Sequence, residues 1–290
     1  MQTVRPGKGK SPEIVRDVAS LRAKVWAWRK RDETVGLIPT MGALHEGHLA
    51  LVKAALQTCD HAVTTIFVNP AQFAPNEDFE AYPRNEADDM AKLASLSADL
   101  AFVPPVQEMY ADGFSTSVAV SGLSEGLCGA SRPHFFGGVA TVVSKLLLQA
   151  LPDRAFFGEK DYQQLQVVTH MARDLDIPVE IVGVPTVRES DGLAMSSRNW
   201  YLSPEERAVA PILYEILCEI AEKLSNGDAS AAAIASAKST LQDAGFGPVD
   251  YIEVCDAISL EPLERADRPA RVLAAAYLGR TRLIDNVPVG

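Results

Sequence analysis

The sequence predicts an α/β fold with a parallel sheet and helices on both faces, followed by a smaller α+β domain. Two observations carry this prediction. Short apolar runs rich in β-branched residues alternate with segments of helical periodicity as far as Val184, which is the pattern of βαβ units. After Pro185 the alternation ends, and two helical patterns precede two further strand patterns. We therefore expect one domain over residues 1–186 and a second over residues 187–290.

The first domain is expected to alternate regularly. Apolar periodicity predicts a helix over 14–30, a strand over 34–38 and a helix from about 47 to 57. A second β-branched run at 62–68 ends at Asn69-Pro70, where proline stops a strand. The later expected elements are a helix at 86–96, strands at 100–103, 155–157 and 179–184, and helices at 139–150 and 162–174.

The second domain opens with a clear helix start. Ser203 is a good N-cap, Pro204 suits the first turn, and acidic residues follow. We expect this helix to run to about residue 224 and a second, alanine-rich helix to reach about 244. A turn at 245–248 and strands at 249–254 and 271–277 complete the domain, which we expect to act as a lid.

Composition excludes several classes of protein. The chain has 290 residues and a formal net charge of −11, which argues against a broad basic surface for nucleic acid. No apolar run approaches the roughly 20 residues that cross a bilayer, and the polar start at 1–10, expected to be a tail, does not resemble a secretory signal. The four cysteines show no C-x-x-C spacing and indicate reduced thiols. A cytoplasmic protein that does not bind membranes or nucleic acid is expected.

The most informative stretch is M-G-A-L-H-E-G-H at 41–48, between the strand at 34–38 and the next helix. A helix start presents N–H groups and partial positive charge, which suit a phosphate. His45 and His48 are three residues apart, so their rings lie on one face and can donate to the same phosphate group. A zinc-protease motif is disfavoured because it needs histidines four apart. A capping turn with partly buried histidines remains the alternative.

Three other polar motifs occupy comparable positions. Asn69 and Gln72 follow the second strand, where their amides could bind a hydroxyl or carboxylate; a simple turn is the alternative. F-G-E-K-D-Y-Q-Q at 157–164 follows a later strand, with a lysine for phosphate charge and an aspartate for a ribose hydroxyl or a helix cap. S-D-G-L-A-M-S-S-R-N at 190–199 offers hydroxyls and a guanidinium for a developing phosphoryl charge. The last two could instead be solvated loops.

Together these motifs carry a resemblance. H-x-x-H after a strand and a later M-S-S-R resemble the nucleotidylyltransferase superfamily and its Rossmann-like fold. The longer set P-T-M-G-A-L-H-E-G-H-L, F-V-N-P-A-Q-F, F-G-E-K-D-Y-Q-Q-L, V-R-E-S-D-G-L-A-M-S-S-R-N and T-R-L-I-D-N resembles the pantothenate synthetase (pantoate–β-alanine ligase) family. The resemblance extends from about residue 34 to 287, and several of these motifs are long and specific.

The resemblance implies a two-step ligation. Pantoate carboxylate would attack the α-phosphate of Mg²⁺-bound ATP, and β-alanine would then displace AMP from the pantoyl adenylate. His48 would be the proton donor, with His45, Lys160 and Arg198 as the other catalytic groups. ATP would be bound by Met41, Gly42, Ala43, Leu44, His45, Glu46, Gly47, His48, Gly158, Glu159, Lys160, Asp161, Val187, Met195, Ser196, Ser197 and Arg198. Pantoate would contact Asn69, Gln72 and Gln164, β-alanine would contact Gln72, and Asp89 would help to place Mg²⁺. A homodimer is also implied.

One departure from the family pattern leaves alternatives open. Where the family has R-P-G-H-F-R-G-V, residues 132–139 read R-P-H-F-F-G-G-V. Phe135 replaces the family histidine and Gly137 the second arginine, unless a local shift lets His134 serve. Two other functions stay in view: a nucleotidylyltransferase of the same fold group that stops at an activated product, and a non-catalytic ATP-binding protein whose altered loop has abolished turnover. The loop change could equally be harmless.

Overall fold

The computed structural model describes residues 11–74 and 79–290, so the expected tail at 1–10 lies outside the described residues. The described chain divides into two compact units. The first comprises the described residues up to Ser121, with His134–Glu159 and Val167–Pro185. The second comprises Thr186–Gly290 together with Gly122–Pro133 and Lys160–Gln166. Two short segments that precede residue 186 in the chain therefore belong with the C-terminal unit.

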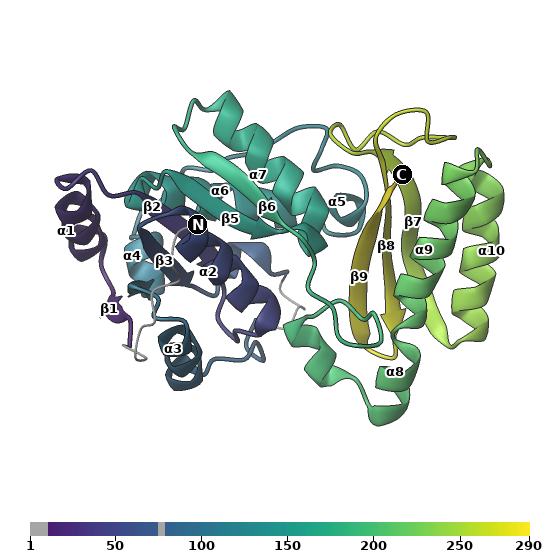
Figure 1. Ribbon diagram of the computed structural model, residues 1–290, viewed down its shortest axis with the longest axis horizontal. Helices are drawn as coiled ribbons and strands as arrows, with labels where there is room; N and C mark the ends of the chain where they lie inside the picture. Colours follow the sequence, from purple (N-terminus) through teal and green to yellow (C-terminus); the bar gives the residue numbers. More distant parts are fainter. Residues whose placement is uncertain (1–10, 75–78) are drawn as a thin grey trace. The chain divides into compact units, whose positions relative to one another are not determined.

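A parallel sheet forms the centre of the first unit (Figure 1). In the described residues its strand order is β1-β4-β3-β2-β5-β6, and all neighbours run parallel. The strands are β1 (Glu13–Val15), β2 (Val35–Thr40), β3 (His61–Ile66), β4 (Leu100–Phe102), β5 (Arg154–Gly158) and β6 (Glu180–Val184). The predicted parallel α/β fold is confirmed.

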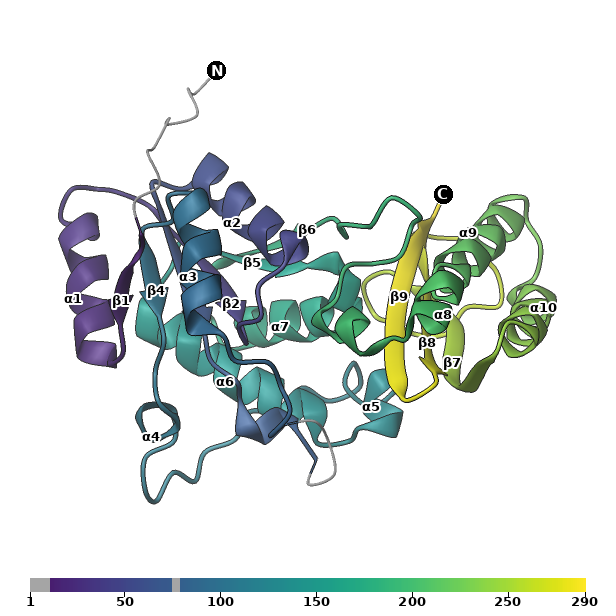
Figure 2. The same cartoon turned by 90° about the horizontal axis from the view of Figure 1, so that it is seen from below.

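Helices cover both faces of this sheet (Figure 2). Helices α2 (Glu46–Thr58) and α3 (Glu86–Ser95) lie on one face. Helices α1 (Val18–Arg29) and α6 (Phe135–Ala150) and the part of α7 (Tyr162–Asp174) from Val167 lie on the other. The chain adds strands outward from β2 in one direction and from β5 in the other, so these neighbours form the switch point where such sheets bind ligands.

The core of the first unit explains why these segments pair. Leu37 and Ile38 of β2 are fully buried, as is Ala55 of α2, and Phe156 of β5 is nearly so. A strand in the middle of a parallel sheet has both faces covered, so its sequence is apolar at consecutive positions. That pattern made these strands recognisable from the sequence.

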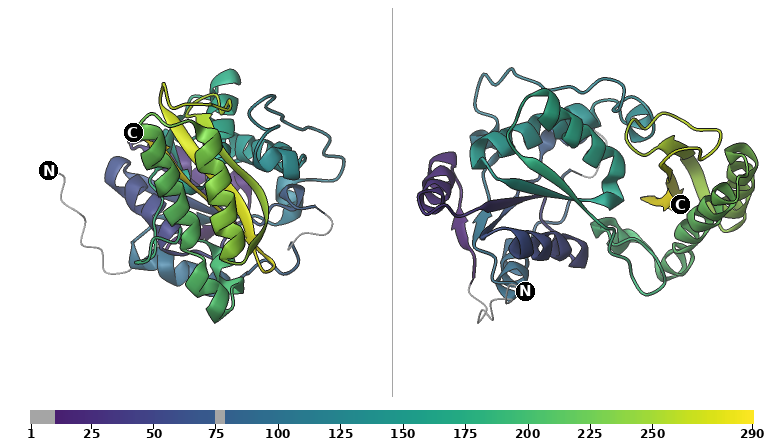
Figure 3. Two further views of the ribbon diagram at one scale, coloured as in Figure 1. Left: turned by 90° about the vertical axis from the view of Figure 1, so that its right-hand side faces the viewer. Right: turned by 45° about the horizontal axis from the view of Figure 1, so that its top comes forward.

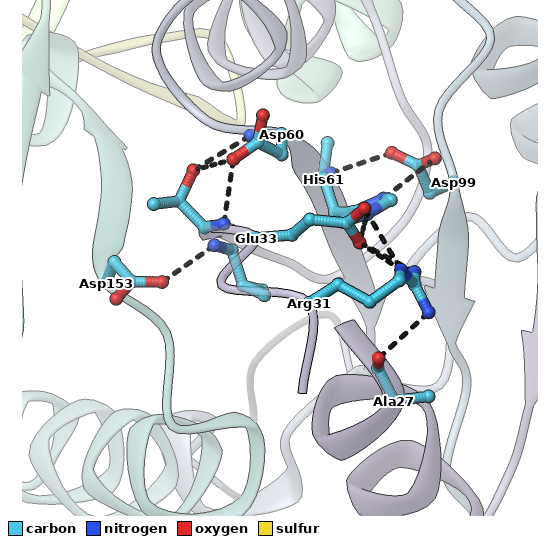
Figure 4. A network of polar contacts seen from close by, with 10 residues as sticks. Ala27, Arg31, Glu33, Asp60, His61, Asp99 and Asp153 are labelled. Carbon is cyan, nitrogen blue, oxygen red and sulfur yellow. Dashed lines mark hydrogen bonds and ion pairs between the residues drawn. The ribbon is translucent and has the colours of Figure 1, made fainter. Parts of the chain in front are cut away.

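A polar network ties the amino-terminal ends of β2 and β3 to the end of α1 (Figure 4). Nε2 of His61 lies 2.9 Å from Oε2 of Glu33, and its Nδ1 lies 3.2 Å from Oδ1 of Asp99. The ring also stacks on Trp28 with centroids 4.1 Å apart. Hydrogen bonds from the Arg31 guanidinium and, to a smaller extent, from His61 hold the pKa of Glu33 below its ordinary value. These contacts give this end of the sheet a structural role.

The second unit contains an antiparallel meander of β7 (Phe246–Asp256), β8 (Ala270–Leu278) and β9 (Thr281–Val289) in the described chain. Helices α9 (Ile212–Ser225) and α10 (Ser230–Asp243) pack side by side on this sheet (Figure 3, left). Leu213, Leu217 and Leu241 point from the helices into the core and are almost fully buried. The predicted smaller α+β domain is confirmed.

The remaining elements are short. They are α4 (Val106–Met109), α5 (Cys128–Ser131), α8 (Pro204–Val209) and the 3₁₀ turns η1 (Pro70–Gln72), η2 (Glu159–Asp161) and η3 (Ser197–Tyr201). None of the described helices is long and apolar enough to cross a membrane.

Three sequence-based expectations about elements were wrong, and one strand of the second unit was missed. The predicted helix over 14–30 begins only at Val18, because Asp17 caps it and the preceding residues pair with β4. The helix expected from residue 204 to 224 is broken at Pro211, which cannot donate to the preceding turn. The turn expected at 245–248 is largely the irregular start of β7. Strand β9, which contains T-R-L-I-D-N, was not predicted.

Candidate active site

The turn between β2 and α2 is held by hydrogen bonds from both sides. The Thr40 hydroxyl donates to the carbonyl of Thr65 at 2.6 Å and accepts from the N–H of Gly42 at 3.2 Å. Gly42 has φ +83°, and a Cβ there would lie 3.0 Å from Oδ2 of Asp89. Only glycine suits this position without strain. The turn therefore follows the strand end in one defined conformation.

The carboxylate of Asp89, on α3, organises the same turn. Its Oδ2 accepts from the N–H of Ala43 at 3.0 Å and its Oδ1 from that of Leu44 at 2.7 Å. Lys92, one turn along α3, donates to the Leu44 carbonyl at 2.6 Å. Burial raises the pKa of Asp89 above its ordinary value, although the two backbone donors oppose this. Asp89 is thus a support of the turn, and its predicted contact with Mg²⁺ stays a prediction.

His45 and His48 cap helix α2 together. Nδ1 of His45 accepts from the N–H of Gly47 at 3.1 Å, and Nδ1 of His48 accepts from the backbone N–H of His45 at 3.3 Å. The ring centroids lie 4.1 Å apart. Since both Nδ1 atoms accept, each neutral ring carries its proton on Nε2. The two histidines therefore form the capping turn that was the alternative to a phosphate site. The tautomer of each ring also suits donation to an anion.

Asn69 and Gln72 form a buried amide pair after β3. Asn69 Nδ2 donates to Oε1 of Gln72 at 2.9 Å and to the carbonyl of Gly138 at 3.1 Å. Asn69 Oδ1 accepts from the hydroxyl of Tyr110 at 2.8 Å and from the N–H of Ala71 at 3.2 Å. Asn69 is 1% and Gln72 7% exposed. Asn69 thus makes four hydrogen bonds within the protein, one of which orients Gln72.

The departure at 132–139 lies at the start of α6. His134 is exposed and occupies the N-cap position without a side-chain cap bond, whereas Phe136 is buried. A Cβ at Gly138 would lie 2.2 Å from the carbonyl oxygen of Ala71, so this glycine permits close contact with η1. A Cβ at Gly137 meets no described heavy atom within 4 Å. The family glycine before the valine is thus retained for packing.

Gly158 is the last residue of β5, which pairs with β2 in the first unit, and Glu159 follows it. Lys160 begins a segment of the second unit. Lys160 Nζ lies 3.8 Å from Oδ2 of Asp161, and the lysine side chain is 18% exposed. Gln164, in the first turn of α7, is partly exposed. Lys160 and Asp161 thus lie next to each other, with Gln164 in the helix that follows, and their predicted contacts with phosphate, ribose and pantoate stay predictions.

Residues 187–198 form a narrow antiparallel loop in the second unit. The N–H of Met195 donates to the Val187 carbonyl at 3.0 Å, and Arg188 bridges to Ala194. Ser196 caps the 3₁₀ turn that contains Ser197 and Arg198, its Oγ accepting from the N–H of Arg198 at 3.2 Å. The hydroxyls and the guanidinium thus sit on one short turn, as an anion clamp requires.

The predicted residues accordingly fall into two sets. The first unit holds the 41–48 turn, Asn69, Gln72, Asp89, Gly158 and Glu159; the second holds Lys160, Asp161, Gln164, Val187, Met195, Ser196, Ser197 and Arg198. Sequence reasoning missed Thr40 and Tyr110, whose partners lie 25 and 41 residues away. It also missed Gln163, whose buried amide accepts from the N–H of Cys128 and donates to the carbonyls of Leu123 and Gly126. No sequence spacing signals such contacts. Among the described residues, no group of three or more His, Cys, Asp or Glu is arranged for a metal.

Residues 13–288 match the family model described as pantoate-beta-alanine ligase. The chain is 62% identical to the pantothenate synthetase of Paramagnetospirillum magneticum, over 95% of this chain and 97% of the relative. It is 57% identical to the pantothenate synthetase of Caulobacter vibrioides, over 97% and 99% respectively. The similarity thus extends over nearly the full length of each protein.

Solved structures agree with these relatives. The pantothenate synthetase of Thermus thermophilus superposes with a TM-score of 0.90 at 48% identity, over 96% of this chain and 99% of that one. The pantoate-beta-alanine ligase of Francisella tularensis, solved with beta-gamma ATP and beta-alanine, has a TM-score of 0.81 at 33% identity, over 96% and 98%.

Proposed function

Because this chain belongs to the pantoate–β-alanine ligase family, whose reaction yields pantothenate, we propose that the reaction it catalyses depends on ATP and proceeds through a pantoyl adenylate. AMP and pyrophosphate are the other products. The Francisella tularensis relative was solved with beta-gamma ATP and beta-alanine, which supports the choice of co-substrates.

One observation carries the proposal. The α2 N-terminus lies at the switch point of the sheet, and two imidazoles, 4.1 Å apart, cap it through their Nδ1 atoms. This arrangement directs protons to the Nε2 atoms, next to the partial positive charge of the helix start. A phosphate group is an anion that such a helix N-terminus binds well, which supports the choice of ATP.

In the proposed first step, a carboxylate oxygen of pantoate attacks the α-phosphorus of ATP. The new P–O bond forms as the bond to the bridging oxygen breaks, and pyrophosphate leaves with that electron pair. His48 donates to the phosphates, His45 assists, and Lys160 and Arg198 neutralise developing charge. Gly158, Glu159, Asp161, Val187 and Met195 are proposed to contact the nucleoside, and Ser196 and Ser197 the phosphates.

In the proposed second step, the amine of β-alanine attacks the carbonyl carbon of the adenylate. The C–N bond forms, AMP leaves through its phosphate oxygen, and the nitrogen loses a proton. Gln72 is proposed to bind pantoate and β-alanine, and Gln164 to bind pantoate. Asn69 is placed by its four internal hydrogen bonds to orient Gln72. Positioning, without an enzyme nucleophile, is then the main source of rate.

Mg²⁺ enters this proposal as the ion that accompanies ATP. Hard oxygen ligands and phosphates are what Mg²⁺ prefers, usually with few protein carboxylates. Asp89 is a carboxylate next to the 41–48 turn, but both its oxygens already accept from backbone N–H groups. These bonds favour a role for Asp89 in shaping the turn that receives the phosphates.

An assay of AMP formation with ATP, pantoate and β-alanine, omitting each in turn, tests the proposal. Pantoate-dependent exchange of pyrophosphate into ATP is expected without β-alanine, and AMP release is expected only when β-alanine is added. A protein that stops at an activated product would exchange pyrophosphate without the second effect. ATP binding without any exchange would contradict the proposal outright.

The family relationship also leads us to propose a homodimer located in the cytoplasm. Sedimentation velocity at micromolar concentration tests the first point, for which a monomer would be the contrary result. Fractionation of cells that produce the protein tests the second.

A further inference from the structure

Two adjacent residues of β9, Asp285 and Asn286, are buried and charged or polar. Each is 4% exposed. They belong to the T-R-L-I-D-N motif, to which the proposed mechanism gives no task. Burying such side chains is unfavourable unless they are fully hydrogen-bonded. Their partners therefore indicate what the two residues do.

Asp285 holds the base of the 187–198 loop. Its two carboxylate oxygens accept from Nη1 and Nη2 of Arg188 at 2.6 and 2.9 Å. Nη1 of Arg188 also donates to the Gly192 carbonyl at 3.0 Å, and the guanidinium lies 3.8 Å from the ring centroid of Tyr214. Bidentate pairing of this kind fixes direction as well as distance. The loop that ends in Arg198 is thus anchored at its start by β9.

Asn286 holds the segment of the same unit that contains Lys160. Its Nδ2 donates to the carbonyl of Lys160 at 2.9 Å, and its Oδ1 accepts from Nη1 of Arg271 at 2.8 Å. Arg271 lies over the ring of Tyr162, 3.8 Å from its centroid. Both ends of the amide are therefore engaged, and the backbone of Lys160 is connected to β8 and β9.

We propose that Asp285 and Asn286 are positioning residues for the ligase reaction, Asp285 acting through the loop of Arg198 and Asn286 through Lys160. This inference rests on the proposed function, because it takes Lys160 and Arg198 to bind the phosphates of ATP. Neighbouring positions of one rigid strand fix two segments that are far apart in sequence. Strand β9 then sets the geometry of both cationic side chains.

Two isosteric substitutions isolate the two links. Asn286→Asp retains the acceptor for Arg271 but removes the donor to the Lys160 carbonyl. Asp285→Asn removes the charge and one of the two acceptors that face Arg188. Each should lower pantoate-dependent ATP–pyrophosphate exchange by about tenfold, the order expected from one lost hydrogen bond. Val287→Ala, on the same strand and 7% exposed, is the matched control; it should lower thermal stability but leave exchange within about twofold.

Double-mutant cycles distinguish positioning from general damage. In a Lys160→Ala background, Asn286→Asp should cost less than about twofold, and in an Arg198→Ala background the cost of Asp285→Asn should likewise shrink. The crossed pairs, Asn286→Asp with Arg198→Ala and Asp285→Asn with Lys160→Ala, should multiply their losses. Thermal unfolding must show that each variant is folded; Asn286→Ala replaces Asn286→Asp in the cycle otherwise.

Equal, multiplicative losses in the matched and crossed pairs would overturn the inference, because they are what a purely structural role gives. Wild-type exchange distinguishes this failure from failure of the proposed function. If the wild-type protein shows no pantoate-dependent exchange, the ligase mechanism and this inference both fail. If it exchanges but the cycles multiply, only the inference fails.

Discussion

The backbone N–H of His45 donates to Nδ1 of His48 at 3.3 Å, so a histidine proposed to donate to phosphate is also part of the cap of its own helix. The bond fixes the ring orientation and places the proton of the neutral ring on Nε2. One side chain thus combines a structural acceptor and a proposed catalytic donor, and suitable substitutions can separate them.

The first prediction concerns His48. Asparagine can replace the Nδ1 acceptor but cannot reach as Nε2 does, and glutamine does the reverse. His48→Asn should keep thermal stability near wild type while adenylation falls by about 100-fold or more, as for loss of a transition-state donor. His48→Gln should retain more activity but lose about 1 kcal/mol of stability with the cap. Pyrophosphate exchange and chemical denaturation measure the two effects.

The same ranking in both assays would contradict this separation. An Ala substitution, which removes acceptor and donor together, provides the reference for loss of both functions.

The second prediction concerns two neighbouring glycines of α6. Gly138→Ala forces a Cβ to within 2.2 Å of the Ala71 carbonyl oxygen, and overpacking of this kind costs about 1–3 kcal/mol. The shift of η1 should also raise the KM for pantoate, since η1 carries Gln72. Gly137→Ala is the matched control, because its Cβ meets no described atom; stability should stay constant or rise by up to about 1 kcal/mol.

Denaturant unfolding and steady-state kinetics check both variants. Two alanine variants that behave alike would show that the contact between α6 and η1 is not as close as the structure has it.

The third prediction concerns Arg198. Its replacement by alanine should lower adenylation by about 10³-fold, the lower range for a guanidinium that stabilises phosphoryl transfer. Arg198→Lys retains charge but not the planar fork, so it should recover only part of the rate. Exchange kinetics give the rates, and unchanged melting temperatures confirm that neither variant is misfolded. Near-normal turnover of Arg198→Ala would remove this residue from the mechanism.

The fourth prediction concerns pH. Asp256 Oδ1 accepts from the N–H groups of Ser259 and Ile258, both at 2.8 Å, and Arg268 adds an ion pair. These donors, Ser259 first, lower the pKa of Asp256 to about 2. A carboxylate whose pKa is lower in the folded state stabilises the fold at pH values above its unfolded-state pKa of about 4. This stabilisation is lost as the pH falls toward 2. Asp256→Ala should therefore lower the melting temperature at pH 7, with a difference from wild type that narrows below pH 4.

Asp267→Ala serves as the control for this titration. Asp267 is 72% exposed and lies 3.9 Å from the same arginine, so its removal should have a small effect at every pH. A gap between Asp256→Ala and wild type that stays constant from pH 7 to pH 3 would contradict the assignment.

The sequence predicts the parts of this molecule that depend on neighbours along the chain. Buried parallel strands such as β2 have apolar residues at successive positions, and the helix after His45 has an apolar side; both were located within a few residues. The position of polar motifs after strand ends followed from the same alternation. The family resemblance then linked these motifs to a reaction.

The parts that were missed depend on distant partners. Strand β1 is three residues long and exists because it pairs with β4. Strand β9 carries buried polar residues, which are stabilised there by hydrogen bonds with Arg188 and with the carbonyl of Lys160. Asp89 was expected from the resemblance to help to place Mg²⁺, and nothing in the sequence indicated that its carboxylate accepts from a turn 45 residues earlier. The periodicity of apolar residues indicates which face of a helix or strand is buried. It contains no information on which distant polar group will form a hydrogen bond with a given side chain.

The link between Asp89 and Leu44 also sets an order of events during synthesis. Both histidines are translated before Asp89, whose carboxylate fixes their turn, because synthesis proceeds from the N-terminal end. A nascent chain that stops short of α3 therefore possesses the histidines without the backbone conformation that aims them. The turn at 41–48 can therefore reach its final conformation only after a helix that contributes nothing to its sequence motif has been made.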